Sequence, residues 1–274
     1  MKRILLYANN KKASVEAKEN LNQLLIEHGY EVVTDKPDLI VVFGGDGTML
    51  SAIRKYRTRK VPFIGVNTGT LGFLPSVPPS NLEIIMDILE NKNYSIQSYP
   101  LLEVKCKTVK GDEIDSYAFN EILIKHLEPR LMEAKIYING KPFNYFTGDG
   151  FIVSTPIGST GYAIWAGGVA THSELPVYQL TPLNANDNSI NRPLKSSLVV
   201  PIETMIDFHI IKSKYRAVIV ACDGRKVSDD FISEIHVEAA HKEVQILRWG
   251  DYDYFELYKN KIIDKNLNNR VLYE

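Results

Sequence analysis

The hydrophobic pattern of this chain changes its period near residue 100, and that change constrains the fold more than any other feature of the sequence. From Lys2 to about residue 95, short apolar runs alternate with stretches of helical periodicity, which is typical of a layered, mostly parallel sheet with flanking helices. Over residues 101–250, strand-like composition and alternation with period two predominate. We therefore predict an α/β domain over residues 1–100 and a mostly-β domain over residues 101–250.

The apolar runs RILLYA, DLIVVFGG and VPFIGVN predict the buried strands of the first domain. Helices are predicted over residues 14–28, from Thr48, and after a capping box formed by Ser80 and Glu83. In the second domain, the steps Asn139–Gly140 and Asp223–Gly224 each lie between strand-forming runs and predict hairpins. The tail over residues 251–274 has a weakly helical stretch, and we expect it to pack back on the first domain.

Composition excludes several classes of protein. With 45% hydrophobic and 24% charged residues, the chain has the balance of a globular protein. The formal net charge is -1. The molecule as a whole therefore has no positive electrostatic field that would attract nucleic acid or an anionic membrane. The first apolar run is too short for a signal peptide, and no run is long enough to span a bilayer. The two cysteines, Cys106 and Cys222, are too few for a disulfide framework. We predict a cytoplasmic protein that binds neither nucleic acid nor membrane.

The stretch VVFGGDGTML places three glycines and an aspartate between a buried strand and a helix. Ligands of open α/β sheets gather at the carboxyl ends of strands. Gly44, Gly45 and Gly47 let the backbone approach a ligand, and the helix that starts near Thr48 favours a phosphate. Asp46 is unfavourable beside phosphate unless it performs chemistry, binds a metal or accepts a proton; the alternative is a helix N-cap in a tight turn.

Polar residues also interrupt the β half. Asn120 and Glu121 fall within the apolar run FNEILI, where they need partners unless they lie at a strand end in water. Residues 147–168, TGDGFIVSTPIGSTGYAIWAGG, are rich in glycine, serine and threonine. Such a stretch offers backbone N–H groups and hydroxyls to sugars, bases or phosphates. The six histidines show no metal-ligand spacing, and no metal ligand is assigned to a protein side chain.

These motifs together resemble the NAD kinase family, of bacterial type. Six motifs occur in the family's order and spacing and cover most of the chain. They are GGDGT, NTGTLGFL, the Asn120–Glu121 pair, GDG at 148–150, STPIGSTGYAIWAGG and LTPLNANDNSINRPL. The resemblance implies phosphoryl transfer from ATP, with polyphosphate as an alternative donor, to the 2'-hydroxyl of the adenosine ribose of NAD, giving NADP. It also implies Mg²⁺ or another divalent metal, and a homo-oligomer, dimer or tetramer, with sites near subunit interfaces.

The resemblance also implies roles for individual residues. Asp46 matches the general base or orienting group at the reacting hydroxyl, and Gly44, Gly45, Gly47 and Thr48 form the phosphate loop of the first, donor domain. The second domain then binds the dinucleotide, with Asp149 reaching a neighbouring subunit's dinucleotide and Asp223 close to the site; a plain hairpin turn is the alternative for Asp223. The residues expected to bind NAD are Gly72, Phe73, Leu74, Asn120, Glu121, Asp149, Ser154, Thr160, Gly161, Tyr162, Ala185 and Asp223.

The chain departs from the family pattern at Gly161, where alanine is common, and at Trp165, where a serine is common. Two other functions compete with NAD phosphorylation. A lipid kinase shares the GGDG loop, but the sequence has no basic amphipathic helix or polybasic cluster for a membrane. A dinucleotide sensor without catalysis would use Asp46 only as a cap.

Overall fold

The structure is a computed structural model that describes residues 1–69, 72–74, 76–187, 192–215, 217–250 and 253–264. The chain forms two compact units, Met1–Ser98 with Val244–Glu274, and Tyr99–Glu243. Each unit has its own hydrophobic cluster. The domain limits at residues 100 and 250 stay predictions, because compactness alone does not show that a unit folds by itself.

The first unit contains the predicted parallel sheet. Strands run in the order β2-β1-β3-β4, all parallel, and Ile246 of β16 pairs in parallel with Phe63 of β4. The strands are β1 (Arg3–Ala8), β2 (Glu31–Val32), β3 (Leu39–Phe43) and β4 (Phe63–Val66), and the helices are α1 (Lys12–Glu27), α2 (Asp46–Tyr56), the 3-10 turn η1 (Arg57–Arg59) and α3 (Glu83–Asn91).

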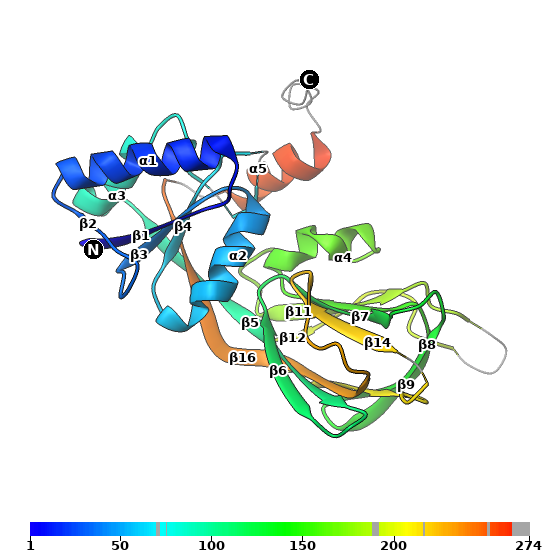
Figure 1. The fold of residues 1–274 in the computed structure, drawn as a ribbon. Coiled ribbons are helices and arrows are strands. Elements are labelled where there is room, and N and C mark those ends of the chain that lie inside the picture. The colour runs from blue at the N-terminus through cyan, green and yellow to red at the C-terminus, as the bar shows by residue number, and fades with distance from the viewer. Residues whose placement is uncertain (70–71, 75, 188–191, 216, 251–252, 265–274) are drawn as a thin grey trace. The chain divides into compact units, whose positions relative to one another are not determined.

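Helices cover both faces of this sheet. Leu39, Val41 and Phe43 of β3 join one cluster with the buried side chains of α1 and α3. The alternate strand residues point to the other face, where α2 lies across the strands from α1 and α3 (Figure 1). Every residue of β3 is buried, as expected of a strand covered on both faces. The α/β class of this unit is confirmed.

Helix α2 begins at Asp46 with Gly45 as its N-cap, two residues from the start predicted near Thr48. The predicted capping box is wrong. Helix α3 begins at Glu83 with Leu82 as N-cap and has no side-chain cap. Ser80 does not form the expected capping box, because a turn closed by a hydrogen bond from Asn81 N to Pro78 O separates it from the helix.

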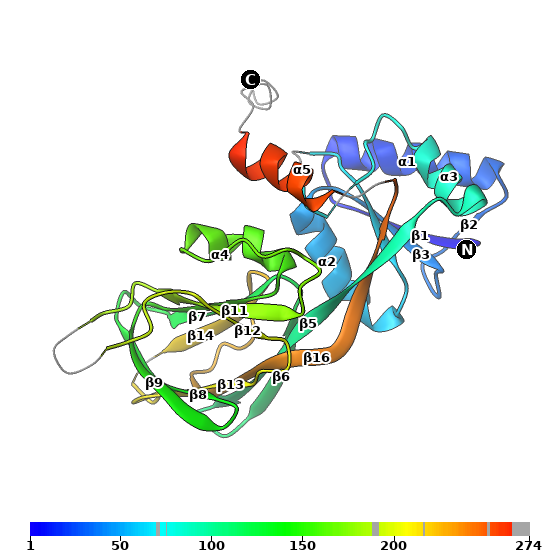
Figure 2. The same cartoon turned by 180° about the vertical axis from the view of Figure 1, so that it is seen from behind.

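The second unit is mostly β, as predicted, and two sheets share one core. One sheet has the antiparallel order β12-β11-β10-β7-β14-β15; the other contains β16, β13, β8 and β9, with β5 pairing β16 and β6. Side chains of both sheets meet in one cluster, and Figure 2 shows the strands from behind. The strands are β5 (Ser95–Thr108), β6 (Glu113–Ala118), β7 (Glu121–His126), β8 (Met132–Ile138), β9 (Lys141–Gly148), β10 (Gly150–Ser154), β11 (Val177–Leu183), β12 (Leu198–Pro201), β13 (Ile206–Ile210), β14 (Val218–Cys222), β15 (Arg225–Lys226) and β16 (Ile232–Arg248).

Both predicted hairpins are present. Asn139 and Gly140 join β8 to β9 with φ of 50° and 73°, and Asp223 and Gly224 join β14 to β15 with φ of 46° and 75°. Two left-handed residues in succession are the geometry of the tight hairpin turn that Asn-Gly and Asp-Gly favour.

The described part of the tail belongs to the first unit. Helix α5 (Tyr254–Tyr258) begins after Asp253, whose carboxylate accepts hydrogen bonds from Phe255 N and Glu256 N, and the π-helical turn η3 (Lys259–Ile263) continues it. Among the described residues, the structure contains no helix with the length and apolar character needed to cross a bilayer.

Candidate active site

The double glycine forms the turn between β3 and α2. A Cβ added to Gly44 would lie 2.2 Å from Thr48 Oγ1, so a side chain at residue 44 would displace Thr48. The Thr48 hydroxyl in turn accepts a hydrogen bond of 2.9 Å from Asn9 Nδ2, at the end of β1. A Cβ at Gly45 or Gly47 would meet no atom of the described residues within 4 Å, so the backbone there is open to a ligand. An open backbone at a helix N-terminus is suited to a phosphate.

The Asp46 carboxylate is directed away from its own helix. Its Oδ1 accepts from Leu74 N at 3.0 Å, and its Oδ2 accepts from Phe73 N at 3.1 Å and from Lys261 Nζ at 2.6 Å. Asp46 is the first residue of α2, and the N-cap position belongs to Gly45. The alternative of an N-cap aspartate is therefore wrong, and the carboxylate joins α2 to two distant segments of the same unit.

The loop that contains Phe73 and Leu74 is held from two sides. While its N–H groups donate to Asp46, the Leu74 carbonyl accepts a 2.8 Å hydrogen bond from Arg248 Nη1. Arg248 is 1% exposed and also donates through Nε to Gln97 Oε1 at 3.1 Å. Because a buried guanidinium is costly unless its donors are satisfied, these bonds fix the loop, including buried Gly72, against α2.

In the second unit, the Asp223 carboxylate organises the segment before β7. It accepts from the backbone N–H groups of Phe119 at 2.8 Å, Asn120 at 2.8 Å and Glu121 at 3.2 Å. Asp223 N returns a bond of 3.0 Å to Glu121 O. Asp223 is thus more than a turn residue, because the hairpin that it opens also orients the Asn120–Glu121 pair.

The Gly/Ser/Thr-rich stretch closes on the other side of the same pair. Thr155 N donates to Asn120 O at 2.9 Å, and Thr155 Oγ1 donates to Phe119 O at 2.7 Å. A Cβ added to Gly158 would lie 2.1 Å from Asn120 O, so only glycine permits this approach. The stretch continues through η2 (Ile157–Thr160) and α4 (Tyr162–Trp165).

Three polar side-chain atoms in this region are buried and have no hydrogen-bond partner among the described residues. They are Asn120 Oδ1, Glu121 Oε2 and Ser154 Oγ, and Ser154 lies directly opposite Glu121 in the β10–β7 register. Burial, and secondarily the charge of Asp223, raises the pKa of Glu121 to about 7. Since buried polar atoms in native proteins are almost always paired, this cluster has the properties of a binding site for a polar ligand.

The structure brings most of the predicted residues of the second unit together, but not all of them. A Cβ on Gly161 would lie 3.5 Å from Glu121 Oε2, next to buried Thr160 and half-exposed Tyr162. Asp149 lies before the opposite end of β10 from Ser154, where its Oδ2 accepts from Asn184 Nδ2 at 2.8 Å, beside Ala185. Asp149 is thus separated along β10 from the Asn120–Glu121 pair, and Ala185 packs against the core cluster of the second unit.

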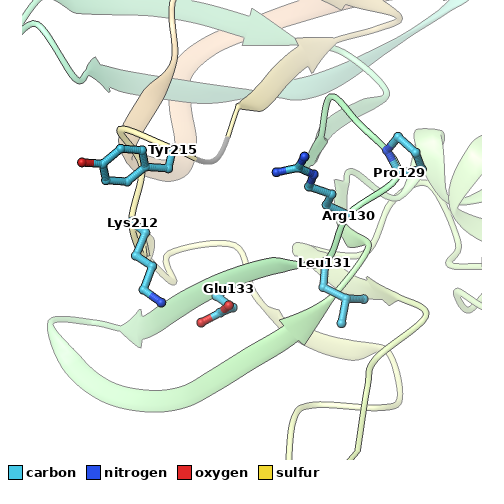
Figure 3. Close-up of a pocket in the computed structure, with 6 residues that line it drawn as sticks. All are labelled: Pro129, Arg130, Leu131, Glu133, Lys212 and Tyr215. Carbon is cyan, nitrogen blue, oxygen red and sulfur yellow. The ribbon is translucent and has the colours of Figure 1, made fainter.

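Sequence reasoning missed Asn9, Lys261 and Arg248. Asn9 carried a usable signal, because it directly follows a strand of a parallel sheet; Lys261 and Arg248 carried none, since their partners are far away in sequence. A hollow of about 640 Å³ on the second unit, drawn in Figure 3, contains none of the predicted residues. Its lining consists of Pro129, Arg130, Leu131, Glu133, Lys212 and Tyr215.

The site combines an open glycine turn at a helix start with a carboxylate beside it, and a separate cluster of buried polar atoms lies in the second unit. These features are typical of nucleotide-binding phosphotransferases. Comparison with known proteins agrees. The model for the ATP-NAD kinase N-terminal domain matches residues 4–94, and that for the ATP-NAD kinase C-terminal domain matches residues 119–249. The chain belongs to the ATP-NAD kinase family.

Relatives match over nearly the whole chain. The NAD kinase of Leuconostoc mesenteroides is 32% identical over 265 residues, 96% of this chain and 99% of that protein. The NAD kinase of Streptococcus pneumoniae is 35% identical over 256 residues, 93% of each.

Solved structures show the same fold. An NAD kinase from Archaeoglobus fulgidus in complex with ATP has a TM-score of 0.73 and 26% identity, covering 94% of this chain and 96% of that one. Yeast NADH kinase complexed with NADH has a TM-score of 0.85 at 20% identity, covering 97% of this chain and 89% of that one, and supports the fold alone.

Proposed function

We propose that the chain is an NAD kinase, which transfers a phosphoryl group from ATP to the 2'-hydroxyl of the adenosine ribose of NAD and gives NADP. Family membership supports the reaction, and so does the complex of the Archaeoglobus relative with ATP. The single observation that carries the proposal is the Asp46 carboxylate, held beside an open glycine turn and away from the capping position of its own helix.

Asp46 is the group that takes the hydroxyl proton. A ribose hydroxyl is a weak nucleophile, so in-line phosphoryl transfer depends on positioning and on a carboxylate that orients the hydroxyl and accepts its proton. Leu74 N and Phe73 N fix both oxygens of Asp46, which supports a preset direction for the remaining lone pairs. The open backbone at Gly45 and Gly47 and the N-terminus of α2 bind phosphate.

The dinucleotide binds at the Asn120–Glu121 pair. The unpartnered Asn120 Oδ1, Glu121 Oε2 and Ser154 Oγ support this role, because ribose hydroxyls and base amino groups are donors that satisfy acceptor atoms of this kind. Asp223 is a positioning residue that acts through the backbone of the pair. Thr160, Gly161 and Tyr162 line the same region, and Gly72, Phe73 and Leu74 form the loop assigned to the base by the family pattern.

A divalent metal, Mg²⁺ in the simplest case, accompanies ATP. The described residues include no group of three or more His, Cys, Asp or Glu side chains placed to hold a metal, and Mg²⁺ commonly uses substrate phosphates with one or two carboxylates instead of a protein cage. The metal would then be held by the phosphates of ATP, and no protein side chain is assigned to it. The metal would neutralise phosphate charge during transfer.

The remaining proposals concern the setting of the enzyme. The chain has only two cysteines, Cys106 and Cys222, both buried, which is too few for a disulfide framework and supports a reducing compartment and hence the cytoplasm. By analogy with the family, the enzyme forms a homo-oligomer, dimer or tetramer, in which Asp149 reaches a neighbouring subunit's dinucleotide. The position of Asp149 apart from the Asn120–Glu121 pair is in keeping with that separate role.

The experiment incubates the purified protein with NAD, ATP and Mg²⁺ and measures NADP with an NADP-specific dehydrogenase. We expect NADP from the wild type and a kcat lower by about 10² to 10⁴ for Asp46→Asn, with NAD binding retained. A wild-type kcat in Asp46→Asn removes the role of Asp46. If neither protein makes NADP while NAD still binds, the dinucleotide sensor is the better explanation; co-sedimentation with vesicles and phosphorylation of a lipid would favour the lipid kinase.

A further inference from the structure

One hydrogen-bond partner of the Asp46 carboxylate lies outside every family motif identified in the sequence. Lys261, in the π-helical turn of the tail, donates to Asp46 Oδ2 at 2.6 Å. The two side chains are 25% and 29% exposed, so the pair is better shielded from water than an ordinary surface ion pair. The Lys261 ammonium also lies 4.3 Å from the centre of the Phe73 ring, a second attraction that holds it in place.

The donors divide unequally between the two carboxylate oxygens. Among the described residues, Oδ2 accepts from both Phe73 N and Lys261 Nζ, whereas Oδ1 accepts only from Leu74 N. Each carboxylate oxygen has about two lone pairs for hydrogen bonds. Oδ2 is therefore saturated, and Oδ1 keeps one position for a further donor.

From this asymmetry we propose that Lys261 is a positioning residue of the phosphoryl transfer, which directs the reacting hydroxyl to Asp46 Oδ1. The proposal rests on the proposed function. The 2'-hydroxyl donates to Oδ1; as its oxygen forms the bond to the γ-phosphorus, the bond from that phosphorus to the bridging oxygen of ADP breaks, and the hydroxyl proton passes to Oδ1. Lys261 touches neither reactant in this scheme and acts by occupying Oδ2.

The direction of the effect follows from geometry. When the ammonium is removed, Oδ2 regains an acceptor position and competes for the hydroxyl in an orientation that does not align it for attack. Misplaced hydroxyls lower kcat, because in-line transfer tolerates little displacement of the reacting atoms. Binding of NAD changes little, because the unpartnered acceptor atoms assigned to the dinucleotide lie in the second unit.

The test compares Lys261→Met, which keeps the length of the side chain and removes the charge, with Lys261→Arg. Lys259→Met is the matched control, because Lys259 lies in the same turn, is 65% exposed and pairs only loosely with Asp264 at 3.8 Å. We expect Lys261→Met to lower kcat about tenfold with KM for NAD within about twofold, Lys261→Arg to restore most of the loss, and Lys259→Met to behave as wild type.

A double-mutant cycle separates positioning from simple anchoring of the tail. If Lys261 acts through Asp46, Lys261→Met has almost no further effect on kcat in the Asp46→Asn background. The same loss of kcat in both backgrounds, or a wild-type kcat in Lys261→Met, overturns the inference. If the wild type makes no NADP, the proposed function and the inference are both overturned. If the wild type is active and Lys261→Met does not change its kcat, only the inference is overturned.

Discussion

Glu121→Gln is expected to make the second unit more stable in alkaline solution. Burial, with the charge of Asp223 as a second cause, raises the pKa of Glu121 from 4.5 to about 7. The folded state therefore holds this proton more tightly than the unfolded state does. The wild type loses stability as the pH rises from about 4.5, where the unfolded group ionises, until the folded group has ionised above about 7. Glutamine keeps the shape of the side chain and does not ionise.

The magnitude follows from the size of the shift. At about 1.4 kcal/mol per pKa unit, moving from 4.5 to about 7 corresponds to about 3.5 kcal/mol. Glu121 is only partly shielded from solvent, and screening reduces the expected effect to about 2 kcal/mol. We expect the stability gained by Glu121→Gln to be near zero at pH 4.5 and to grow to about this value at pH 8.

Urea denaturation at a series of pH values measures the difference. Circular dichroism follows the unfolding, because Trp165, the tryptophan of the second unit, is 70% exposed in the folded state and its fluorescence would change little on unfolding. Glu27→Gln, at an exposed position of α1, is the control. Parallel stability curves for wild type and Glu121→Gln across this pH range would refute the reasoning, because they would mean that Glu121 ionises equally easily in both states.

The remaining predictions concern the dinucleotide region. Asn120→Ala should weaken NAD binding by about 1 to 3 kcal/mol, because it removes an acceptor from a buried ligand donor; unchanged affinity in a calorimetric titration would contradict the role. Gly158→Ala should cost about 1 to 3 kcal/mol of folding stability, since its Cβ would lie 2.1 Å from Asn120 O. Gly69→Ala should cost far less folding stability, because no atom of the described residues lies within 4 Å of the added Cβ. Equal melting temperatures for the two variants would contradict the packing argument.

Local patterns predicted the elements of the fold well. The period change predicted both the α/β and the β regions, and the two dipeptides Asn139–Gly140 and Asp223–Gly224 predicted hairpins because their left-handed turn is a local property. The capping box at Ser80 was wrong because a preceding turn placed the helix start at Glu83. Helix and turn propensities describe single segments. They do not show whether a residue before a helix joins a turn or caps the helix.

The candidate site was only partly predictable. Asp46 stood out because a charge beside a phosphate turn needs a reason, and Asn120–Glu121 because polar residues interrupted an apolar run. The partners of Asp46 could not be predicted. Lys261 is 215 residues away in sequence, and no local pattern distinguishes it from the other lysines of the tail. Arg248 lies at the end of a strand-like run, where no local pattern predicts its burial or the bond to Leu74 O that holds the loop beside Asp46.

The first unit is assembled from two distant parts of the chain, Met1–Ser98 and Val244–Glu274, and this has a consequence for biosynthesis. At about 5 to 20 residues per second, a ribosome needs roughly 7 to 30 seconds to produce the intervening unit, Tyr99–Glu243. Throughout that interval β4 lacks the parallel partner that Ile246 supplies, and Asp46 lacks Lys261. The nascent chain therefore carries an open sheet edge that chaperones can recognise, and the Asp46 cluster is completed only after Lys261 has been translated.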